Sequence, residues 1–288
     1  MKHDQAAILR QKMQTFNQPY NSKTIAVLSG KDGVGKSNIT VNFSLALIES
    51  GKKVLVVDMD IGMGNIDILL GLQVEKTMID MFEDNLSLFE IIQTGPRNLD
   101  YIAAASGLSS IFSMKDHHKQ LFFNQYGQVI GLYDYVIFDM GAGVTWDAMS
   151  FVLASDECFI VTTPEPTAIT DAYSMIKHIL HYNHTIPIQV IMNRSQSGNK
   201  GWKLLERFTK VVDQFLHVQI GALGVLPYDK TVNQAVINQT PFFVEKERST
   251  ISKAMRKMAG DYLKTQNNRQ DFTSSSFLQK LKQIVKER

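Results

Sequence analysis

The 288 residues are enough to bury a substantial core within an α/β domain. The 30 basic and 28 acidic residues nearly balance, so the net charge of the chain gives no indication of nucleic-acid binding. The single cysteine, Cys158, excludes an internal disulfide framework and leaves no C-x-x-C pair for zinc or an iron–sulfur cluster. The first residues form no apolar signal region, and no run of 18 apolar residues exists, so we expect a cytoplasmic protein.

The first 22 residues carry few apolar side chains. Residues 17–22 have the Asn, Gln, Pro and Ser content of a linker. From this pattern alone we expect a disordered tail in front of the folded domain.

A glycine-rich stretch follows the first apolar run and matches the phosphate-binding P-loop, G-x-x-x-x-G-K-[ST]. Its residues are Gly30, Lys31, Asp32, Gly33, Val34, Gly35, Lys36 and Ser37. Glycines allow the backbone to approach a ligand closely, the lysine reaches the β- and γ-phosphates, and the serine hydroxyl binds Mg²⁺. A strand before this stretch and a helix after it are the context that the motif requires. The pattern therefore predicts nucleotide binding.

From residue 24 onward, short apolar runs alternate with helical patterns. The predicted strands are Thr24–Ser29, Val54–Asp58, Leu99–Ala103, Tyr135–Asp139, Cys158–Thr163, Ile188–Asn193 and Ala222–Leu226. The predicted helices are Ser37–Ser50, Leu86–Gln93, Lys115–Leu132, Thr145–Ala154, Thr167–His181, Lys203–Leu216 and Ser249–Leu263. Continuous apolar strands alternating with helices predict a doubly wound, mostly parallel α/β sheet with helices on both faces. Ligands of such sheets bind at the carboxyl ends of the strands.

Carboxylates lie at two of these predicted strand ends. Asp58 and Asp60 follow one apolar run, and Asp139 ends another, just before a glycine pair. Carboxylates in this position hold Mg²⁺ or orient the attacking water beside a triphosphate, whereas a lone Asp is often only a helix cap. Two such strand ends in a chain with a P-loop favour the metal and water roles.

The C-terminal part carries a second pattern after the folded domain of residues 23–264. Residues 265–276 read as a polar linker, and residues 277–288 as a basic amphipathic helix. The apolar positions of that helix are Phe277, Leu278, Leu281, Ile284 and Val285. Such a helix suits a membrane surface, but it also suits packing back on the domain as an ordinary last helix.

The motifs together resemble the MinD/ParA family of P-loop ATPases. Lys31 beside the first glycine, with Lys36 later, looks like the deviant Walker A motif of that family. Residues 58–67 and 139–143 resemble its two switch regions, and residues 163–167 and 191–194 also match its signatures. The resemblance spans about residues 23–263.

The resemblance implies roles for particular residues. Lys36 and Ser37 bind phosphate and Mg²⁺, and Lys31 reaches the nucleotide of the opposite subunit of a homodimer. Asp60 positions the hydrolytic water, Asp58 and Asp139 support the metal, and Asn193 hydrogen-bonds adenine. The implied nucleotide-binding set is Gly30, Lys31, Asp32, Gly33, Val34, Gly35, Lys36, Ser37, Asn38, Asp139 and Asn193.

The N-terminal heptad resembles an element of the flagellar regulators within that family. It reads D-Q-A-x-x-L-R and comprises Asp4, Gln5, Ala6, Leu9 and Arg10. The resemblance changes our expectation for this tail from disorder to a docking motif. It implies a slow ATPase that dimerises with ATP, binds membrane through residues 277–288 and stimulates the flagellar GTPase FlhF. Flagellar C-ring proteins are further implied partners.

One residue departs from the family pattern, because Asp32 stands where the family usually has Gly. Its carboxylate adds like-charge repulsion near the γ-phosphate, which affects turnover more than binding.

Two alternative functions use the same scaffold. A ParA-type DNA-partitioning ATPase needs a basic dimer surface, which the balanced charge does not favour. An iron–sulfur carrier needs paired cysteines, which the lone Cys158 nearly eliminates.

Overall fold

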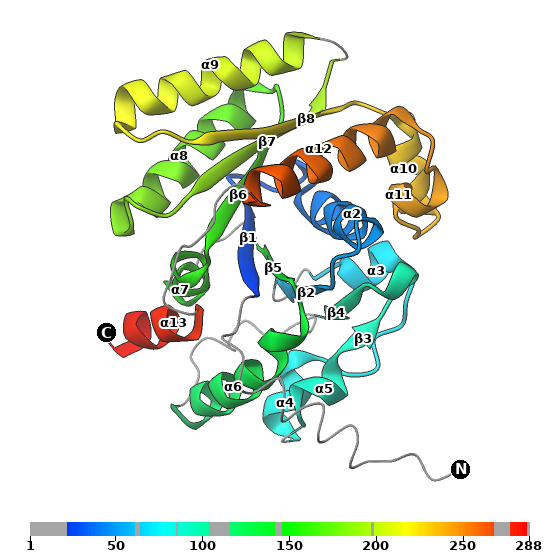
Figure 1. The fold of residues 1–288 in the computed structure, drawn as a ribbon, viewed down its shortest axis with the longest axis vertical. Coiled ribbons are helices and arrows are strands. Elements are labelled where there is room, and N and C mark those ends of the chain that lie inside the picture. Colours follow the sequence, from blue (N-terminus) through cyan, green and yellow to red (C-terminus); the bar gives the residue numbers. More distant parts are fainter. Residues whose placement is uncertain are drawn as a thin grey trace.

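The computed structural model describes residues 22–60, 64–84, 86–103, 116–141, 146–196, 199–267 and 277–286. Within these ranges a single sheet has the strand order β3-β4-β2-β5-β1-β6-β7-β8 (Figure 1). The strands are β1 (Lys23–Ser29), β2 (Val54–Met59), β3 (Gln93–Thr94), β4 (Asp100–Ile102), β5 (Tyr135–Met140), β6 (Glu157–Thr162), β7 (Ile188–Ser195) and β8 (Gly221–Pro227). Neighbouring strands are parallel except for β3, which pairs antiparallel with β4.

The seven predicted strands are confirmed, each to within two residues of its expected bounds. Strands β2, β5 and β6 are buried along their whole length, which explains why their sequences are continuous apolar runs rather than alternating ones. The short edge strand β3 was not predicted. Gln93 was expected to end a helix, but it pairs with Tyr101 of β4, so a tertiary contact overrides the local helical pattern.

Helices cover both faces of the sheet. One core contains side chains of α4 (Met78–Glu83), α5 (Leu88–Ile91), α6 (Asp116–Val129), α7 (Trp146–Ala154), α8 (Pro166–Tyr182), α9 (Asn199–Leu216) and α13 (Phe277–Lys286). The other contains side chains of α2 (Lys36–Glu49), α3 (Ile66–Leu70), α10 (Lys230–Ile237), α11 (Phe242–Glu245) and α12 (Thr250–Asn267). Two 3₁₀ turns occupy Pro96–Asn98 and Ile130–Leu132. Figure 1 shows this layered arrangement, as the predicted doubly wound fold requires.

The boundaries near the C-terminus differ from those predicted. Helix α12 continues to Asn267, three residues into the stretch expected to be a linker from Thr265. The polar composition of these residues reads as a linker locally, but a tertiary contact orders the last turn, because Gln266 accepts a hydrogen bond from Lys23 Nζ at 2.5 Å. The short helices α3, α4, α10 and α11 were not predicted either, since each is too brief to show a helical repeat.

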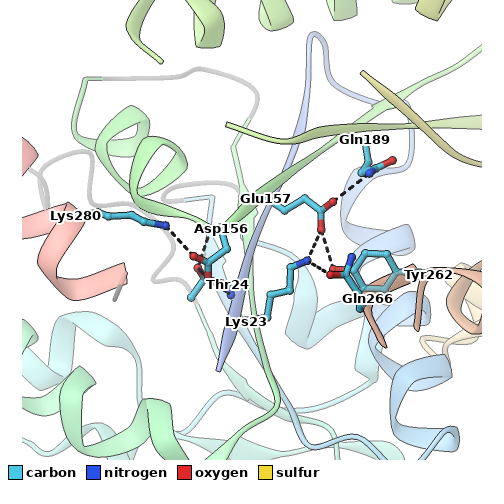
Figure 2. A network of polar contacts seen from close by, with 8 residues as sticks. All are labelled: Lys23, Thr24, Asp156, Glu157, Gln189, Tyr262, Gln266 and Lys280. Atoms are coloured by element: carbon cyan, nitrogen blue, oxygen red, sulfur yellow. Dashed lines mark hydrogen bonds and ion pairs between the residues drawn. The ribbon is translucent and has the colours of Figure 1, made fainter. Parts of the chain in front are cut away.

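A polar network joins the amino ends of β1 and β6 to both C-terminal helices (Figure 2). The buried Glu157 carboxylate accepts a hydrogen bond from Tyr262 of α12 at 2.9 Å and lies 2.9 Å from Lys23 Nζ. Beside it, Asp156 accepts hydrogen bonds from the backbone and side chain of Thr24 and pairs with Lys280 of α13 at 2.8 Å. This end of the sheet therefore anchors both helices that close the chain.

The core on the α2 face gives a first prediction. Phe43 is 2% exposed, and its ring lies 5.5 Å from that of Phe159 and 5.6 Å from that of Tyr262, centroid to centroid. Phe43→Ala should lower the free energy of unfolding by about 3–5 kcal/mol, since it leaves a cavity among these rings. Urea unfolding measures this change. Phe215→Ala, which truncates a side chain that is 62% exposed, serves as control and should change the free energy by less than about 0.5 kcal/mol. Equal losses in the two variants would contradict the packing described.

Candidate functional site

The P-loop lies between β1 and α2, at the carboxyl end of the sheet's central strand. Gly30 packs directly on α8, because a Cβ at this position would lie 2.2 Å from the backbone of Asp171. Gly35, with φ of 94°, precedes the first turn of α2, whose backbone N–H groups have no side-chain cap. A helix start with uncapped N–H groups and a glycine-rich approach is an anion site. The predicted phosphate loop is therefore present in the geometry that phosphate binding requires.

A buried ion pair closes the floor of this loop. Lys36 Nζ lies 3.0 Å from Asp139 Oδ1, and Thr40 Oγ1 donates to the same oxygen over 2.8 Å. Lys36 Nζ also lies 3.2 Å from Ser37 Oγ. Asp139 Oδ2 is buried and has no hydrogen-bond partner among the described residues. A carboxylate oxygen without a donor is costly in a buried position, so this atom fits a Mg²⁺ ion or a water bound to one, with Ser37 beside it.

The two carboxylates after β2 have different environments. Asp58 is buried, and its oxygens accept backbone N–H groups of Asp60 at 2.9 Å, Asn65 at 3.1 Å and Ile66 at 3.4 Å. Burial, and then the neighbouring charge of Asp139, raise the pKa of Asp58. In this arrangement Asp58 fixes the first switch segment to the strand end. Its predicted contact with the metal stays a prediction.

Asp60 faces the second switch segment. A Cβ on Gly141 would lie 2.9 Å from Asp60 Oδ1, so a larger residue at 141 would displace this carboxylate. Burial raises the pKa of Asp60, Lys36 lowers it, and the charges of Asp139 and Asp32 raise it further. The charges of Asp139 and Asp32 therefore act on Asp60 beside the P-loop. The predicted role of Asp60 in positioning the attacking water stays a prediction.

Lys31, the second lysine of the motif, is held at the start of α8. Its Nζ donates to Glu165 Oε2 at 2.8 Å and to Thr167 Oγ1 at 3.0 Å. The hydrogen bond from Lys31 lowers the pKa of Glu165. The Lys31 side chain is 31% exposed and Glu165 is 61% exposed, so solvent reaches this pair and it is easily exchanged for another partner.

Asn193, at the end of β7, borders a cavity beside the P-loop. Its Nδ2 donates to the carbonyl of Val34 at 2.8 Å, and Gly35 leaves it room, since a Cβ there would lie 2.6 Å from Nδ2. The cavity has a volume of about 460 Å³, which suits a nucleoside. Its lining includes Gly35, Asn38, Asn193, Arg194, Pro227 and Asp229. Of the residues expected to bind the nucleotide, Gly35, Asn38 and Asn193 thus line one cavity next to the P-loop.

Three polar residues of this site were missed by the sequence reasoning as functional groups. Thr40 holds Asp139, and Glu165 holds Lys31, as described above. Thr163 is buried, and its hydroxyl has no partner among the described residues. Thr40 had a usable signal, because it lies one helical turn after Lys36. Glu165 and Thr163 lie in the stretch 163–167 that resembles a family signature, but the resemblance gave neither residue a role.

The C-terminal helix forms as predicted, but its apolar face packs on the domain. Phe277 and Leu281 are each 2% exposed, and Leu278 and Ile284 pack against the same core. The Phe277 ring lies 5.2 Å from that of Tyr126, 5.1 Å from Phe138 and 5.9 Å from Phe151, centroid to centroid. Of the two roles left open by the sequence, the structure therefore has the docked one. None of the described helices is both long and apolar enough to cross a bilayer.

Some predicted residues lie outside the described ones. These are the N-terminal heptad, with Asp4, Gln5, Ala6, Leu9 and Arg10, and the side chain of Val285. Cys158 is buried, and burial raises the pKa of its thiol, as expected of a structural cysteine.

Several known proteins are similar to this chain in sequence and in fold. The family model described as "ParA: NUBPL iron-transfer P-loop NTPase" matches residues 21–263. The antiactivator FleN of Pseudomonas aeruginosa is 36% identical over 82% of this chain and 85% of FleN. The flagellum site-determining protein YlxH of Helicobacter pylori is 34% identical over 73% of this chain and 71% of YlxH. The solved structure of the septum site-determining protein MinD of Pyrococcus horikoshii, complexed with Mg-ADP, covers 87% of this chain and 100% of that one, with 25% identity and a TM-score of 0.68.

The position of Asp32 leads to a second prediction. Its carboxylate is exposed, and its charge raises the pKa of Asp60, so we expect it to repel a γ-phosphate bound on the loop. Asp32→Gly and Asp32→Asn should each tighten ATP about threefold to tenfold, and ADP less, in calorimetric titrations with Mg²⁺. Agreement between the two variants separates the effect of charge from that of backbone freedom. Equal changes for ATP and ADP would show that the side chain points away from the γ-phosphate.

Proposed function

Because this chain belongs to the ParA/MinD family of P-loop NTPases, we propose that it is an ATP-driven switch that dimerises around ATP, attaches to the membrane and regulates flagella. The chain is an ATPase of this family, and its cofactors are ATP or ADP with Mg²⁺. The observation that carries the proposal is the pair of lysines on one phosphate loop. Lys36 is buried at the floor, and Lys31 is held at the rim by an exchangeable contact.

The geometry supports hydrolysis by positioning and charge. The P-loop N–H groups hold the phosphates, and Lys36 exchanges the Asp139 carboxylate for a phosphate oxygen of similar charge. Bound Mg²⁺ neutralises the developing phosphate charge, and Ser37 with Asp139 would hold it. Asp60 orients the attacking water. Thr40 keeps Asp139 in place when Lys36 leaves, because its hydrogen bond to Oδ1 is independent of the lysine.

The dimer follows from the second lysine. Its contact with Glu165 leaves it available to exchange that carboxylate for the phosphate of a facing subunit. A lysine donated in trans stabilises phosphate charge as an arginine finger does, so dimerisation and hydrolysis become one event.

Membrane attachment requires α13 to leave its groove. The buried Phe277 and Leu281 are the same side chains that would enter a bilayer, so the docked and membrane-bound states exclude each other. Burying each of these side chains contributes roughly 1.5–3 kcal/mol in either place, so apolar burial alone does not favour one state over the other. We infer that the nucleotide site biases the choice between them. Helix α7, which contacts α13 and follows the second switch, lies on the route for that bias.

The flagellar role rests on the relatives. YlxH is named as a flagellum site-determining protein, and FleN as an antiactivator. Within this role, the N-terminal heptad would stimulate the FlhF GTPase, and C-ring proteins of the flagellum are further partners in the proposal. The polar sequence between the heptad and β1 would let the heptad reach a partner while the ATPase domain stays folded.

The dimer gives a third prediction. Lys31→Ala should reduce the ATP-dependent dimer at least about fivefold and leave ADP binding within about twofold, since only a cross-subunit phosphate contact is lost. Light scattering after size exclusion, with Mg²⁺ and ATP or ADP, measures both states. Lys52→Ala, which removes another partly exposed lysine beside a carboxylate, is the control. Asp60→Ala should instead retain the ATP dimer while hydrolysis falls. An undiminished dimer in Lys31→Ala would rule out the cross-subunit role.

The docked helix gives a fourth prediction. Asp156→Asn weakens the anchor of Lys280 but changes no residue of α13, so it should raise nucleotide-free binding to vesicles about threefold to tenfold. Co-sedimentation with vesicles of anionic lipid measures this. Asp84→Asn removes the same charge from an exposed turn and should have no effect. If binding without nucleotide stayed at the wild-type level, release of α13 would not be what limits attachment.

The heptad gives a fifth prediction. A peptide of residues 1–22 should stimulate the purified FlhF GTPase, and the same peptide with Gln5→Ala or Arg10→Ala should stimulate it at least about tenfold less. Gln5 can orient a water, and Arg10 can pair with phosphate or carboxylate. Replacing Lys2 with Ala provides the control. A GTPase rate that the wild-type peptide leaves unchanged would refute this part of the proposal.

A further inference from the structure

Helix α9 carries a row of cations on its outer side. Lys200, Lys203, Arg207 and Lys210 recur at i, i+3, i+7 and i+10, which keeps them on one side of a helix with 3.6 residues per turn. All four are exposed. Within the part of the chain that the structure describes, none of them lies within ion-pair distance of a carboxylate. The row is thus a set of charges that the fold itself does not use.

Exposed apolar side chains flank this row. Val211, which follows Arg207 by one turn, is 37% exposed, and Phe215, one turn later, is 62% exposed. The acids of the helix, Glu206 and Asp213, lie on the opposite flank of the cations. Around its exposed side, α9 therefore passes from acids through cations to an apolar edge. A helix with a cationic face beside exposed aromatic and aliphatic groups is the pattern of interfacial membrane helices.

The position of α9 agrees with this pattern. Leu205 and Phe208 of α9 belong to the same core as Phe277 and Leu281 of α13, so both helices cover one face of the sheet. Figure 1 shows α9, α8, α7 and α13 following one another along that side of the molecule. The outer surface of α9 and the docking site of α13 therefore lie on the same face of the sheet, so one membrane surface could contact α9 while α13 enters it.

We propose that the outer face of α9 is a second membrane-contact surface, which binds anionic lipid headgroups through Lys200, Lys203, Arg207 and Lys210 and places Phe215 in the interface. This inference rests on the membrane attachment proposed above and adds the class of lipid that the protein binds. Helix α13 has 10 described residues, and so short an anchor holds a membrane only marginally on its own. A cationic surface on the same side supplies the second signal that stable attachment needs, and dimerisation doubles both.

The flank of the row distinguishes lipid from nucleic acid. Cations on a helix also suit phosphates of a duplex, but the neighbouring contacts of a duplex are polar. The exposed side chains of Phe215 and Val211 beside the cations lower the free energy of binding when they leave water for an apolar phase such as a bilayer. The net charge of +2 for the whole chain provides no general attraction for nucleic acid.

The test uses the full chain with Mg²⁺ and ATP and two vesicle compositions, zwitterionic lipid alone and zwitterionic lipid with about 30% anionic lipid. The double substitution Lys203→Glu with Arg207→Glu should reduce binding to anionic vesicles at least about tenfold. The matched control, Lys253→Glu with Lys257→Glu, makes the same charge change on exposed positions of α12, on the other face of the sheet, and should stay within about twofold of wild type. Phe215→Ala should reduce binding about threefold to tenfold on both vesicle types.

Each outcome bears on a separate claim. If the α9 variant bound anionic vesicles as well as the α12 control, while Phe277→Asp abolished binding, the inference would be wrong and the proposed membrane switch would stand. If the wild-type chain bound neither vesicle type with ATP, both would fail. If the α9 substitutions removed binding to a short DNA duplex but not to vesicles, the row would be a nucleic-acid surface and the inference would be overturned. Circular dichroism and the ATP-dependent dimer, both expected to match wild type, verify that the variants fold.

Discussion

The buried ion pair between Lys36 and Asp139 is the constraint on which the site depends. It joins the first residue of α2 to the end of β5, the strand that pairs with β1 in the sheet. A buried charge pair is stable only when its remaining atoms find partners. Thr40 satisfies one carboxylate oxygen, and the other remains for a metal or its water. In the free protein, Lys36 is therefore paired with Asp139. The proposed nucleotide complex uses both residues, Lys36 for a phosphate and Asp139 for the metal.

A second polar and apolar anchor lies at the opposite end of the sheet. Asp156 holds the start of β1 through Thr24 and α13 through Lys280 (Figure 2). Phe277 packs against the rings of Tyr126 of α6, Phe138 of β5 and Phe151 of α7. Strand β5 thus supports both regions, because Phe138 packs on Phe277 and the next residue, Asp139, belongs to the nucleotide site. The proposed release of α13 would therefore be adjacent to the nucleotide site through β5, although the two lie at different ends of the strands.

Lys36 and Lys31 differ in exposure, and this difference fits the roles proposed for them. Lys36 is 7% exposed and loses solvent when it pairs, so its position is firmly set. Lys31 lies at the rim with a partner that is mostly in solvent, and such pairs contribute little free energy. A fixed cation suits the nucleotide of its own subunit, and an exchangeable one suits a contact formed only on dimerisation.

The sequence by itself determined the P-loop, the parallel strands and the carboxylates at their ends. These features are local, because glycine spacing, apolar runs and the residue that follows a strand are all read along the chain. The roles of Glu165, Thr40 and Asp156 were decided only by the tertiary structure, since each pairs with a residue far away in sequence. The apolar face of residues 277–286 was predicted, but the sequence left its partner open between a bilayer and the domain. Hydrophobic burial has no direction, so a bilayer and a groove on the domain can both bury the apolar face of this helix. Only the folded domain decided where the helix lies, because it provides aromatic contacts for Phe277 and an ion pair between Asp156 and Lys280.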